Sequence, residues 1–287
     1  MSEFVVVGVD GSTQAASAVQ WGAREAQARG IELRLVHVWS GHAHMARDVQ
    51  TRGATAERAE REGRGLLEIA AVQARQTAPG VQVGEELVPG VPSRQLVEVA
   101  GDASMIVVGM RGRGGFASLL LGSTAQRIAA RSACPVVVLG NGTSAPSTGH
   151  VVLGLDVHRP GDAGLRFAFD AAARREAELH VVYGWAVDDT TARITSGSNF
   201  DLDELRAAQQ RALTEALAPW GARYPQVKVV DISLDATGDA ALVGASVGAG
   251  LLVIGARRPA AGPRHLGPIA HSVLRHAACP VAVVPEV

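Results

Sequence analysis

Apolar residues in this chain gather in short continuous runs, and longer stretches with helical spacing separate them. Each run holds four to six Val, Ile or Leu residues. Runs of this kind indicate strands buried on both faces, as in a parallel sheet. In the first half of the chain we expect strands near residues 4–10, 33–39, 83–89, 105–109 and 136–139.

Helices are predicted between these strands. Small and apolar residues recur at helical spacing from Ala15 to Ala26, after a Ser12 or Thr13 cap and before a stop at Gly30. Three further helices are expected at residues 54–77, 92–100 and 123–131. This alternation predicts an α/β fold with a doubly wound sheet, in which ligands bind beyond the carboxyl ends of the strands.

The whole pattern occurs twice. Residues 4–10 recur as residues 150–156, an offset of 146, and the same offset superimposes the later strands. After Gly255 the offset becomes 145, because the second loop is one residue shorter. A repeat of this length indicates two copies of one domain. We therefore expect a first domain at 1–140, a linker of turn-forming residues at 141–149, and a second domain at 150–287.

Charge and composition exclude several classes of partner. The net charge is −1 and the pI about 6.8, which gives no electrostatic reason to expect nucleic acid or an anionic membrane as partner. No apolar run approaches the ~20 residues that cross a bilayer. The amino terminus enters a strand at once and lacks the features of a signal peptide. We therefore predict a cytoplasmic protein.

Cysteine and histidine usage gives no strong signal for a disulfide or a metal. Cys134 and Cys279 each precede proline at matching points of the repeat. They suit small buried residues in a reducing compartment, although the sequence leaves a disulfide open. His42 and His44, with His37 nearby, have spacing that could hold a metal. They lack a clustered Cys or carboxylate partner, so we predict no metal site made by the protein alone.

A glycine-rich segment follows the strand at 105–109. Two residues separate Gly109 from Gly112, nine separate Gly112 from Gly122, and Ser123 comes directly after. Glycines in such a turn allow positive φ and a close approach to a ligand. The helix that begins near Ser123 offers free N–H groups and the positive end of its dipole. A phosphate site is expected here, and the alternative is a turn that only closes a tight connection.

This G-x2-G-x9-G-S spacing resembles the ATP-binding signature of the universal stress protein family, and the resemblance runs the length of the chain. It implies two tandem Rossmann-like domains of the adenine nucleotide α-hydrolase-like type. Each would hold a five-stranded parallel sheet of order 3-2-1-4-5 with helices on both faces. A P-loop is excluded, because the only lysine is Lys228, which follows valine.

The resemblance also implies an ATP site in the first domain. Asp10 would bond the adenine or ribose, beside Gly8 and Val38, unless its role is to cap the following helix. Mg²⁺ could accompany ATP at Asp10 or Ser123. The phosphates would lie against the loop and the helix start, which comprise Gly109, Met110, Arg111, Gly112, Arg113, Gly114, Gly115, Gly122, Ser123 and Thr124.

The second copy departs from the signature. Arg258 stands at the position of Gly112, and Gly267-Pro268 replaces Gly122-Ser123. Proline has neither an N–H nor a hydroxyl to offer a phosphate. If Gly112 needs positive φ, an arginine in its place costs about 1–2 kcal/mol. We expect weak or absent ATP binding at the remaining candidates, which are Gly154, Asp156, Gly255, Arg257, Arg258 and Gly267.

Three functions are compatible with these patterns. The favoured one is a non-catalytic, ATP-binding regulator in stress response or growth control, with an unknown protein partner. The first alternative is a slow ATP-hydrolysing or adenylyl-transferring enzyme, although the H-x-G-H and S-G-G-x-D-S signatures of adenylyl chemistry are absent. The second is a dimerisation scaffold with a vestigial site. The uncharged strands at 136–139 and 281–284 are expected to pair within the chain, and a homodimer of whole chains is a further expectation.

Overall fold

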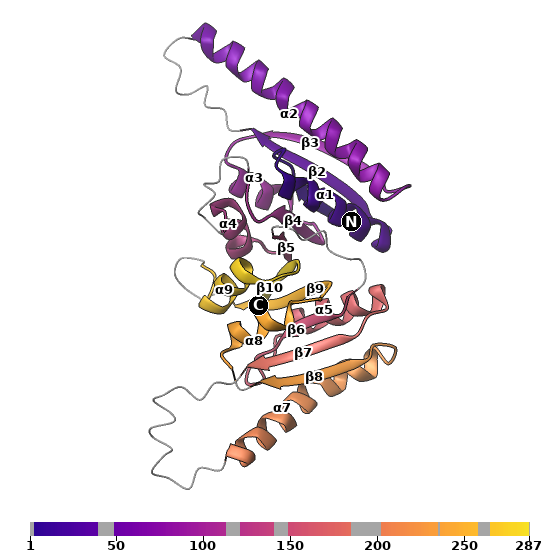
Figure 1. Cartoon of the computed structure of the whole chain (residues 1–287). Coiled ribbons are helices and arrows are strands. Elements are labelled where there is room, and N and C mark those ends of the chain that lie inside the picture. The colour runs from indigo at the N-terminus through magenta and orange to yellow at the C-terminus, as the bar shows by residue number, and fades with distance from the viewer. Residues whose placement is uncertain are drawn as a thin grey trace. The chain divides into compact units, whose positions relative to one another are not determined.

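The fold was obtained as a computed structural model, which describes residues 3–39, 49–112, 121–140, 149–184, 202–234, 236–257 and 265–286. The chain forms two compact units. The first holds the elements up to Leu139, and the second holds those from Val151 onwards (Figure 1). Each unit is described by itself below.

The first unit alternates strand and helix as predicted. Its elements are β1 (Phe4–Gly8), α1 (Thr13–Arg29), β2 (Glu32–Trp39), α2 (Val49–Thr77), β3 (Val83–Pro89), α3 (Pro92–Val99), β4 (Met105–Gly109), α4 (Ser123–Arg131) and β5 (Val136–Leu139). The strands are parallel and lie in the order β3-β2-β1-β4-β5. Helices α1 and α2 pack on one face of the sheet, and α3 and α4 pack together on the other.

The second unit repeats this arrangement. Its elements are β6 (Val151–Gly154), α5 (Asp162–Arg175), β7 (Leu179–Gly184), α7 (Leu202–Arg223), β8 (Val229–Leu234), α8 (Gly238–Ala245), β9 (Leu251–Arg257), α9 (Pro268–His276) and β10 (Val281–Glu286). Its parallel strands lie in the order β8-β7-β6-β9-β10. The predicted order 3-2-1-4-5 is therefore confirmed in both copies.

Local signals explain where the elements begin and end. Helix α1 begins after Ser12, whose side-chain oxygen accepts a hydrogen bond from Ala15 N, and it ends at Gly30 with φ 66°. Strand β1 ends at Gly8, two residues earlier than predicted, because Asp10 turns to bond Ser12. Strands β1 and β4 are almost wholly buried, as expected for central strands covered on both faces, and the edge strand β5 is buried as well.

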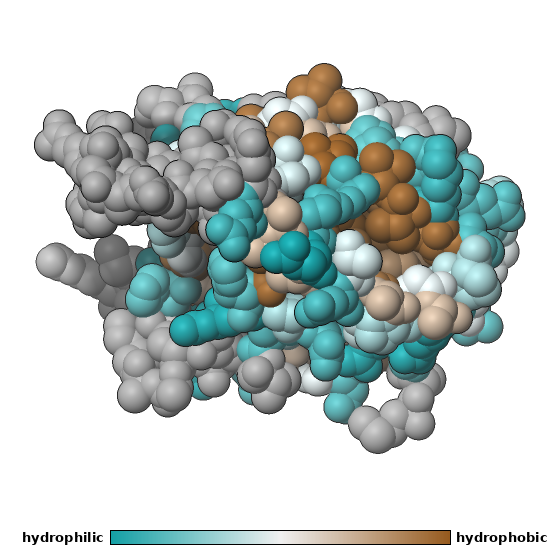
Figure 2. All heavy atoms as spheres, turned by 90° about the horizontal axis from the view of Figure 1, so that it is seen from below, coloured by the Kyte–Doolittle hydropathy of each residue, from teal (hydrophilic) through white to brown (hydrophobic). Residues whose placement is uncertain are grey.

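The cores absorb most of the large apolar side chains. Seen from below in Figure 2, the surface is largely hydrophilic, with apolar side chains gathered in one area. Within the described residues the exposed large apolar side chains are Ile69, Val72, Val91, Leu234, Val247 and Ile269. Both cysteines are buried, as expected for small residues at matching points of the repeat. Across the described part of the chain, no helix combines the length and apolarity needed to traverse a bilayer.

Candidate functional site

The carboxyl ends of β1 and β4 bring together the loop that follows each strand. Oδ1 of Asp10 accepts hydrogen bonds from Ser12 N at 2.9 Å and from Ser12 Oγ at 2.6 Å. The same Oγ accepts from Ala15 N at 3.1 Å, so Ser12 caps α1 and Asp10 fixes the cap. Ser12 Oγ also lies 3.5 Å from the carbonyl oxygen of Arg111, on the glycine-rich loop. Residues about 100 positions apart in sequence therefore meet at this edge.

Glycine is required at three points of the loop because other groups come too close for a side chain. A Cβ on Gly112 would clash with Oδ2 of Asp10. A Cβ on Gly109 would lie 2.6 Å from Gln14 Cβ, in the first turn of α1, and one on Gly122 would lie 2.8 Å from the carbonyl oxygen of Met110. None of the three glycines has positive φ. The sequence-based reason was therefore wrong for these positions, since close approach is what excludes a side chain.

The loop is anchored at both ends by main-chain hydrogen bonds. Met110 N donates to the carbonyl oxygen of Leu139 at 2.7 Å, and Gly122 N donates to that of Met110 at 2.9 Å. Met110 itself is buried, so the loop rests on the sheet edge. Arg113, Gly114 and Gly115 fall outside the described residues.

Helix α4 begins where this loop ends. Gly122 is its N-cap, with φ −72° and ψ 143°, and this residue has no side chain that could cap the first turn. Gln126 N is the first amide to bond back within the helix, to the carbonyl oxygen of Gly122. Ser123 and Thr124 are exposed. The amides that precede Gln126 at this helix start therefore lack an intrahelical acceptor, which is the arrangement that an anion can satisfy.

The predicted base-side residues lie on the other strand ends. Gly8 ends β1, where a Cβ would lie 3.1 Å from Leu96 of α3, and Val38 is a largely buried residue of β2. Between them, His37 Nδ1 lies 2.7 Å from the carbonyl oxygen of Val9, so the ring donates there. Sequence reasoning considered His37 only as a metal ligand and missed this contact, which no spacing pattern signals.

At the equivalent edge of the second unit, the side chains bond one another and the nearby main chain. Arg257 Nη1 lies 3.1 Å from Asp156 Oδ2, and Arg257 Nη2 lies 2.5 Å from the carbonyl oxygen of Arg159. His158 N donates to the other oxygen of Asp156 at 3.1 Å. Burial, and to a lesser degree the charge of Asp156, raise the pKa of Tyr183 nearby. Asp156 is therefore already matched by a cation.

Strand pairing also continues further in the second unit. Strand β9 runs two residues past Gly255, and Arg257 pairs with Glu286 of β10. Glu286 Oε1 accepts from Gly164 N at 2.8 Å and its Oε2 from Ala163 N at 3.3 Å, so this carboxylate caps α5. Gly154 ends β6 and Gly267 is the N-cap of α9, followed by Pro268. Arg258 lies outside the described residues.

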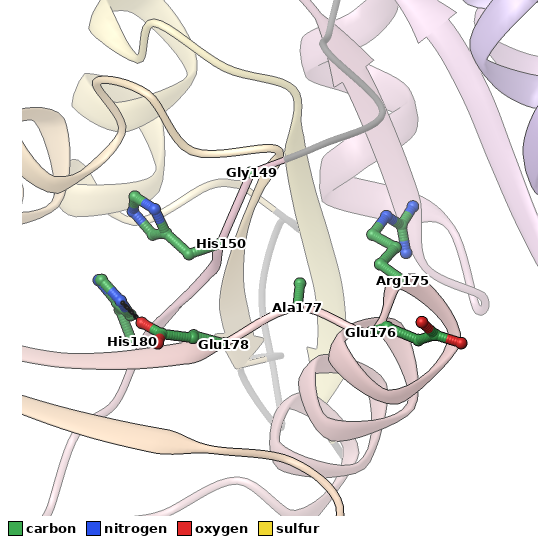
Figure 3. Close-up of a pocket in the computed structure, with 7 residues that line it drawn as sticks. All are labelled: Gly149, His150, Arg175, Glu176, Ala177, Glu178 and His180. Carbon is green, nitrogen blue, oxygen red and sulfur yellow. Dashed lines mark hydrogen bonds and ion pairs between the residues drawn. The ribbon is translucent and has the colours of Figure 1, made fainter.

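Candidate metal ligands and a pocket in the second unit lie outside the predicted nucleotide site. Within the described residues, no group of His, Cys, Asp and Glu could hold a metal ion. His42 and His44 lie outside them. A pocket of about 370 Å³ opens beside His150 and His180 (Figure 3), next to residues that precede β6 and β7. It lies at the opposite end of these strands from Asp156, so it is separate from the predicted nucleotide site.

Comparisons with known proteins agree with this architecture. The model of the universal stress protein family matches residues 1–140 and again 148–285. Universal stress protein Rv2005c of Mycobacterium tuberculosis is 32% identical over 286 residues, covering 97% of this chain and 96% of the relative. Universal stress protein Rv2623 of the same organism is 30% identical over 289 residues, covering 98% and 96%.

Solved structures match the fold over the full length. A universal stress protein from Archaeoglobus fulgidus superimposes with a TM-score of 0.73 and 19% identity, covering 100% of both chains. A functionally unknown protein from Pseudomonas aeruginosa gives a TM-score of 0.62 and 17% identity, covering 99% of this chain and 93% of its own. At such identities the likeness concerns the fold alone.

Proposed function

Because the chain belongs to the universal stress protein family, we propose that it acts in stress response as a non-catalytic regulator that binds ATP in its first domain. Family membership supports the stress-response role, and the geometry of the glycine-rich loop supports the ligand. The domain limits of the proposal are 1–140 and 150–287, with the linker at 141–149.

The observation that carries the proposal is the close packing of Asp10 against Gly112, next to a helix start without a side-chain cap. Glycine at this point lets the loop approach the carboxylate of Asp10 at the strand edge, where a Cβ would clash with Oδ2. The first amides of α4 would bind the phosphates, and Arg111 would add a guanidinium to their oxygens. Asp10 would face the ribose or adenine. Mg²⁺, if bound with ATP, would supply charge neutralisation between phosphate oxygens.

The second domain is proposed to bind nucleotide weakly or not at all. Arg257 already pairs with Asp156, at the position that corresponds to Asp10. Strand β9 pairs with β10 as far as Arg257. In the first domain the corresponding residues belong to the glycine-rich loop and not to a strand. Pro268 at the helix start has no N–H. Each difference either removes a donor that the first site has or occupies the counterpart of its acceptor Asp10.

The charges available argue against fast turnover. Phosphoryl transfer depends on positioning and charge stabilisation. The only lysine, Lys228, lies in the second unit, where its Nζ donates to Glu178 Oε1 at 2.6 Å. The first site therefore has arginine and main-chain amides but no lysine for a transferring phosphoryl group. An enzyme remains the alternative that the experiments below separate.

Cytoplasmic location and assembly stay predictions. Strand β5 is buried and uncharged, and β10 begins with four buried apolar residues. Such strands need cover. The proposal keeps pairing of the two domains within one chain, a homodimer of whole chains, and an unidentified regulatory protein partner.

Acid extraction of the purified chain, followed by chromatography, tests the ligand. We expect about one adenine nucleotide per chain. Calorimetric titration of the emptied chain with ATP should then give about one site. No retained nucleotide together with no binding would overturn the proposal. Phosphate release with Mg²⁺ at a sustained rate would favour the enzyme.

A matched pair of variants locates the site. Gly122→Ala places a methyl group against the carbonyl oxygen of Met110, whereas Gly267→Ala, at the same point of the second copy, meets none of the described residues within 4 Å. We expect Gly122→Ala to weaken ATP binding at least about ten-fold and Gly267→Ala to leave it unchanged. Equal effects of the two variants would place the nucleotide elsewhere.

A further inference from the structure

Two histidines of the second domain form a stacked pair at the amino-terminal ends of its strands. His150 directly precedes β6 and His180 lies in β7. Their ring centroids are 4.0 Å apart with an interplanar angle of 18°. His180 Nε2 lies 3.1 Å from Oε2 of Glu178, and the other oxygen of Glu178 accepts from Lys228 (Figure 3 shows the pair and the carboxylate). The pair forms one wall of the pocket described above.

The first domain builds the same stack from different residues. The offset of 146 takes His150, His180 and Glu178 to Phe4, Arg34 and Glu32. Arg34 Cζ lies 3.8 Å from the centre of the Phe4 ring, and Arg34 Nη2 lies 3.1 Å from Glu32 Oε2. Both copies therefore place a ring under a nitrogen group that bonds a carboxylate. Arginine keeps its charge at every physiological pH, whereas imidazole changes charge near neutrality.

We propose that the His150–His180–Glu178 stack is a pH-sensitive latch, closed while His150 is neutral and opened when His150 gains a proton. The first domain holds a version that does not respond to pH. Opening loosens the edge where β6 and β7 begin and leaves the opposite edge, with Asp156, in place.

Electrostatics gives the direction of the response. Two cations 4.0 Å apart repel each other, and Glu178 compensates only in part because Lys228 shares it. Burial, followed by the charge of His180, lowers the pKa of His150, against smaller opposing effects of a hydrogen bond with the Ala245 backbone and the charge of Glu178.

The unfolded chain consequently binds more protons than the folded one as the pH falls below 6.5, the ordinary pKa of histidine. The stability that a neutral His150 provides is present above that value and declines below it. The remaining charged groups around the pocket are Arg175 and Glu176, at the end of α5, which carry opposite signs.

Main-chain hydrogen bonds report on this edge in both copies. Gly250 N donates to the carbonyl oxygen of His150 at 2.9 Å, and Leu179 N donates to that of Lys228 at 2.9 Å. The equivalent bonds in the first domain run from Ser104 N to Phe4 at 2.9 Å and from Leu33 N to Gln82 at 2.8 Å. The first pair monitors the histidine stack, and the second pair is an internal control in the same molecule.

Amide hydrogen exchange of the full chain tests the latch, with rates corrected for their intrinsic pH dependence. Between about pH 7.5 and about pH 5.5 we expect protection of Leu179 and Gly250 to fall by roughly three- to ten-fold, with Leu33 and Ser104 unchanged. The double variant His150→Phe/His180→Arg, which copies the first domain, should remove the difference. Equal loss in both domains, or loss retained in the double variant, would overturn the proposal.

A second measurement serves if the double variant does not fold. His180→Gln keeps an N–H for Glu178 and removes the titratable charge. The proton NMR signal of His150 should then titrate at a higher pH than in the wild-type chain. An unchanged midpoint would show that the two rings are not coupled, contrary to the latch.

Discussion

The carboxylate of Asp10 fills the space that a side chain on Gly112 would need, so the loops after β1 and β4 fit together only with glycine at that position. The two residues belong to the separate sequence signals from which the ATP site was inferred. Their contact makes each signal depend on the other.

Replacing Gly112 with alanine should therefore weaken nucleotide binding through Asp10. The methyl group must displace Oδ2, which disturbs the hydrogen bonds between Asp10 and Ser12. We expect ATP affinity to fall about ten-fold, which corresponds to about 1.4 kcal/mol. Calorimetric titration measures it. The double variant Asp10→Ala/Gly112→Ala should bind no worse than Asp10→Ala alone, and a further loss in the double variant would contradict the coupling.

Two serines at helix starts should separate stability from binding. Ser12 caps α1 through Ala15 N, whereas Ser123 is the exposed first residue of α4, after the N-cap Gly122. Ser12→Ala should reduce the free energy of unfolding by about 1 kcal/mol. Ser123→Ala should leave it unchanged and weaken ATP binding by roughly three- to ten-fold. Denaturant unfolding and calorimetry measure the two effects, and unfolding of the domain by Ser123→Ala would contradict the assignment.

Two glycines of α2 should respond in opposite ways to alanine. A Cβ on Gly63 would lie 2.8 Å from the His37 ring, which its hydrogen bond to Val9 holds in place, whereas a Cβ on Gly65 has no atom of the described part of the chain within 4 Å. Gly63→Ala should destabilise the first domain by about 1–3 kcal/mol. Gly65→Ala should stabilise it by up to about 1 kcal/mol, the helix preference of alanine. Urea unfolding decides, and a stable Gly63→Ala would show that His37 is free to move.

Cys279 should be unreactive in the folded chain. Burial raises the pKa of its thiol to about 12 from an ordinary value of 9.0, so little thiolate exists near neutrality. Iodoacetamide should label it only after unfolding. Because the unfolded thiol loses its proton first, the stability tied to this group is complete below pH 9.0 and declines as the pH rises towards about 12. Cys279→Ser should reduce that decline, and rapid labelling at pH 8 would contradict the buried environment.

Much of the fold was predictable because its signals are local and occur twice. Apolar runs gave every strand of the first domain to within two residues at its start or end, and the helix from 123 to 131 has the predicted limits. The sheet order came from the family resemblance, since a run such as Val136–Leu139 does not state its neighbours. The predicted end of β1 was too late because the apolar pattern of the strand does not decide where it stops. The side chain of Asp10, which accepts a hydrogen bond from Ser12, does.

The site was less predictable because its contacts join distant residues. Spacing identified Gly112 as necessary, but only coordinates show that Asp10, and not positive φ, excludes a side chain there. The bond from His37 to Val9 and the cap that Glu286 forms on α5 carry no sequence signature. The ion pair between Arg257, a candidate residue of the weak second site, and Asp156 likewise carries no sequence signature.

The two residue pairs that extend β9 and β10 beyond Gly255 set a condition for anyone who wishes to build a second nucleotide pocket into this protein. Exchanging Arg258 for glycine and Pro268 for serine would restore the residues of the signature. The backbone of β9 would still be paired with β10. A working design would have to combine three changes. It would break those strand pairs, lengthen the loop by one residue and remove the contact of Arg257 with Asp156. The two copies thus differ in main-chain pairing, and a single substitution cannot reverse that difference.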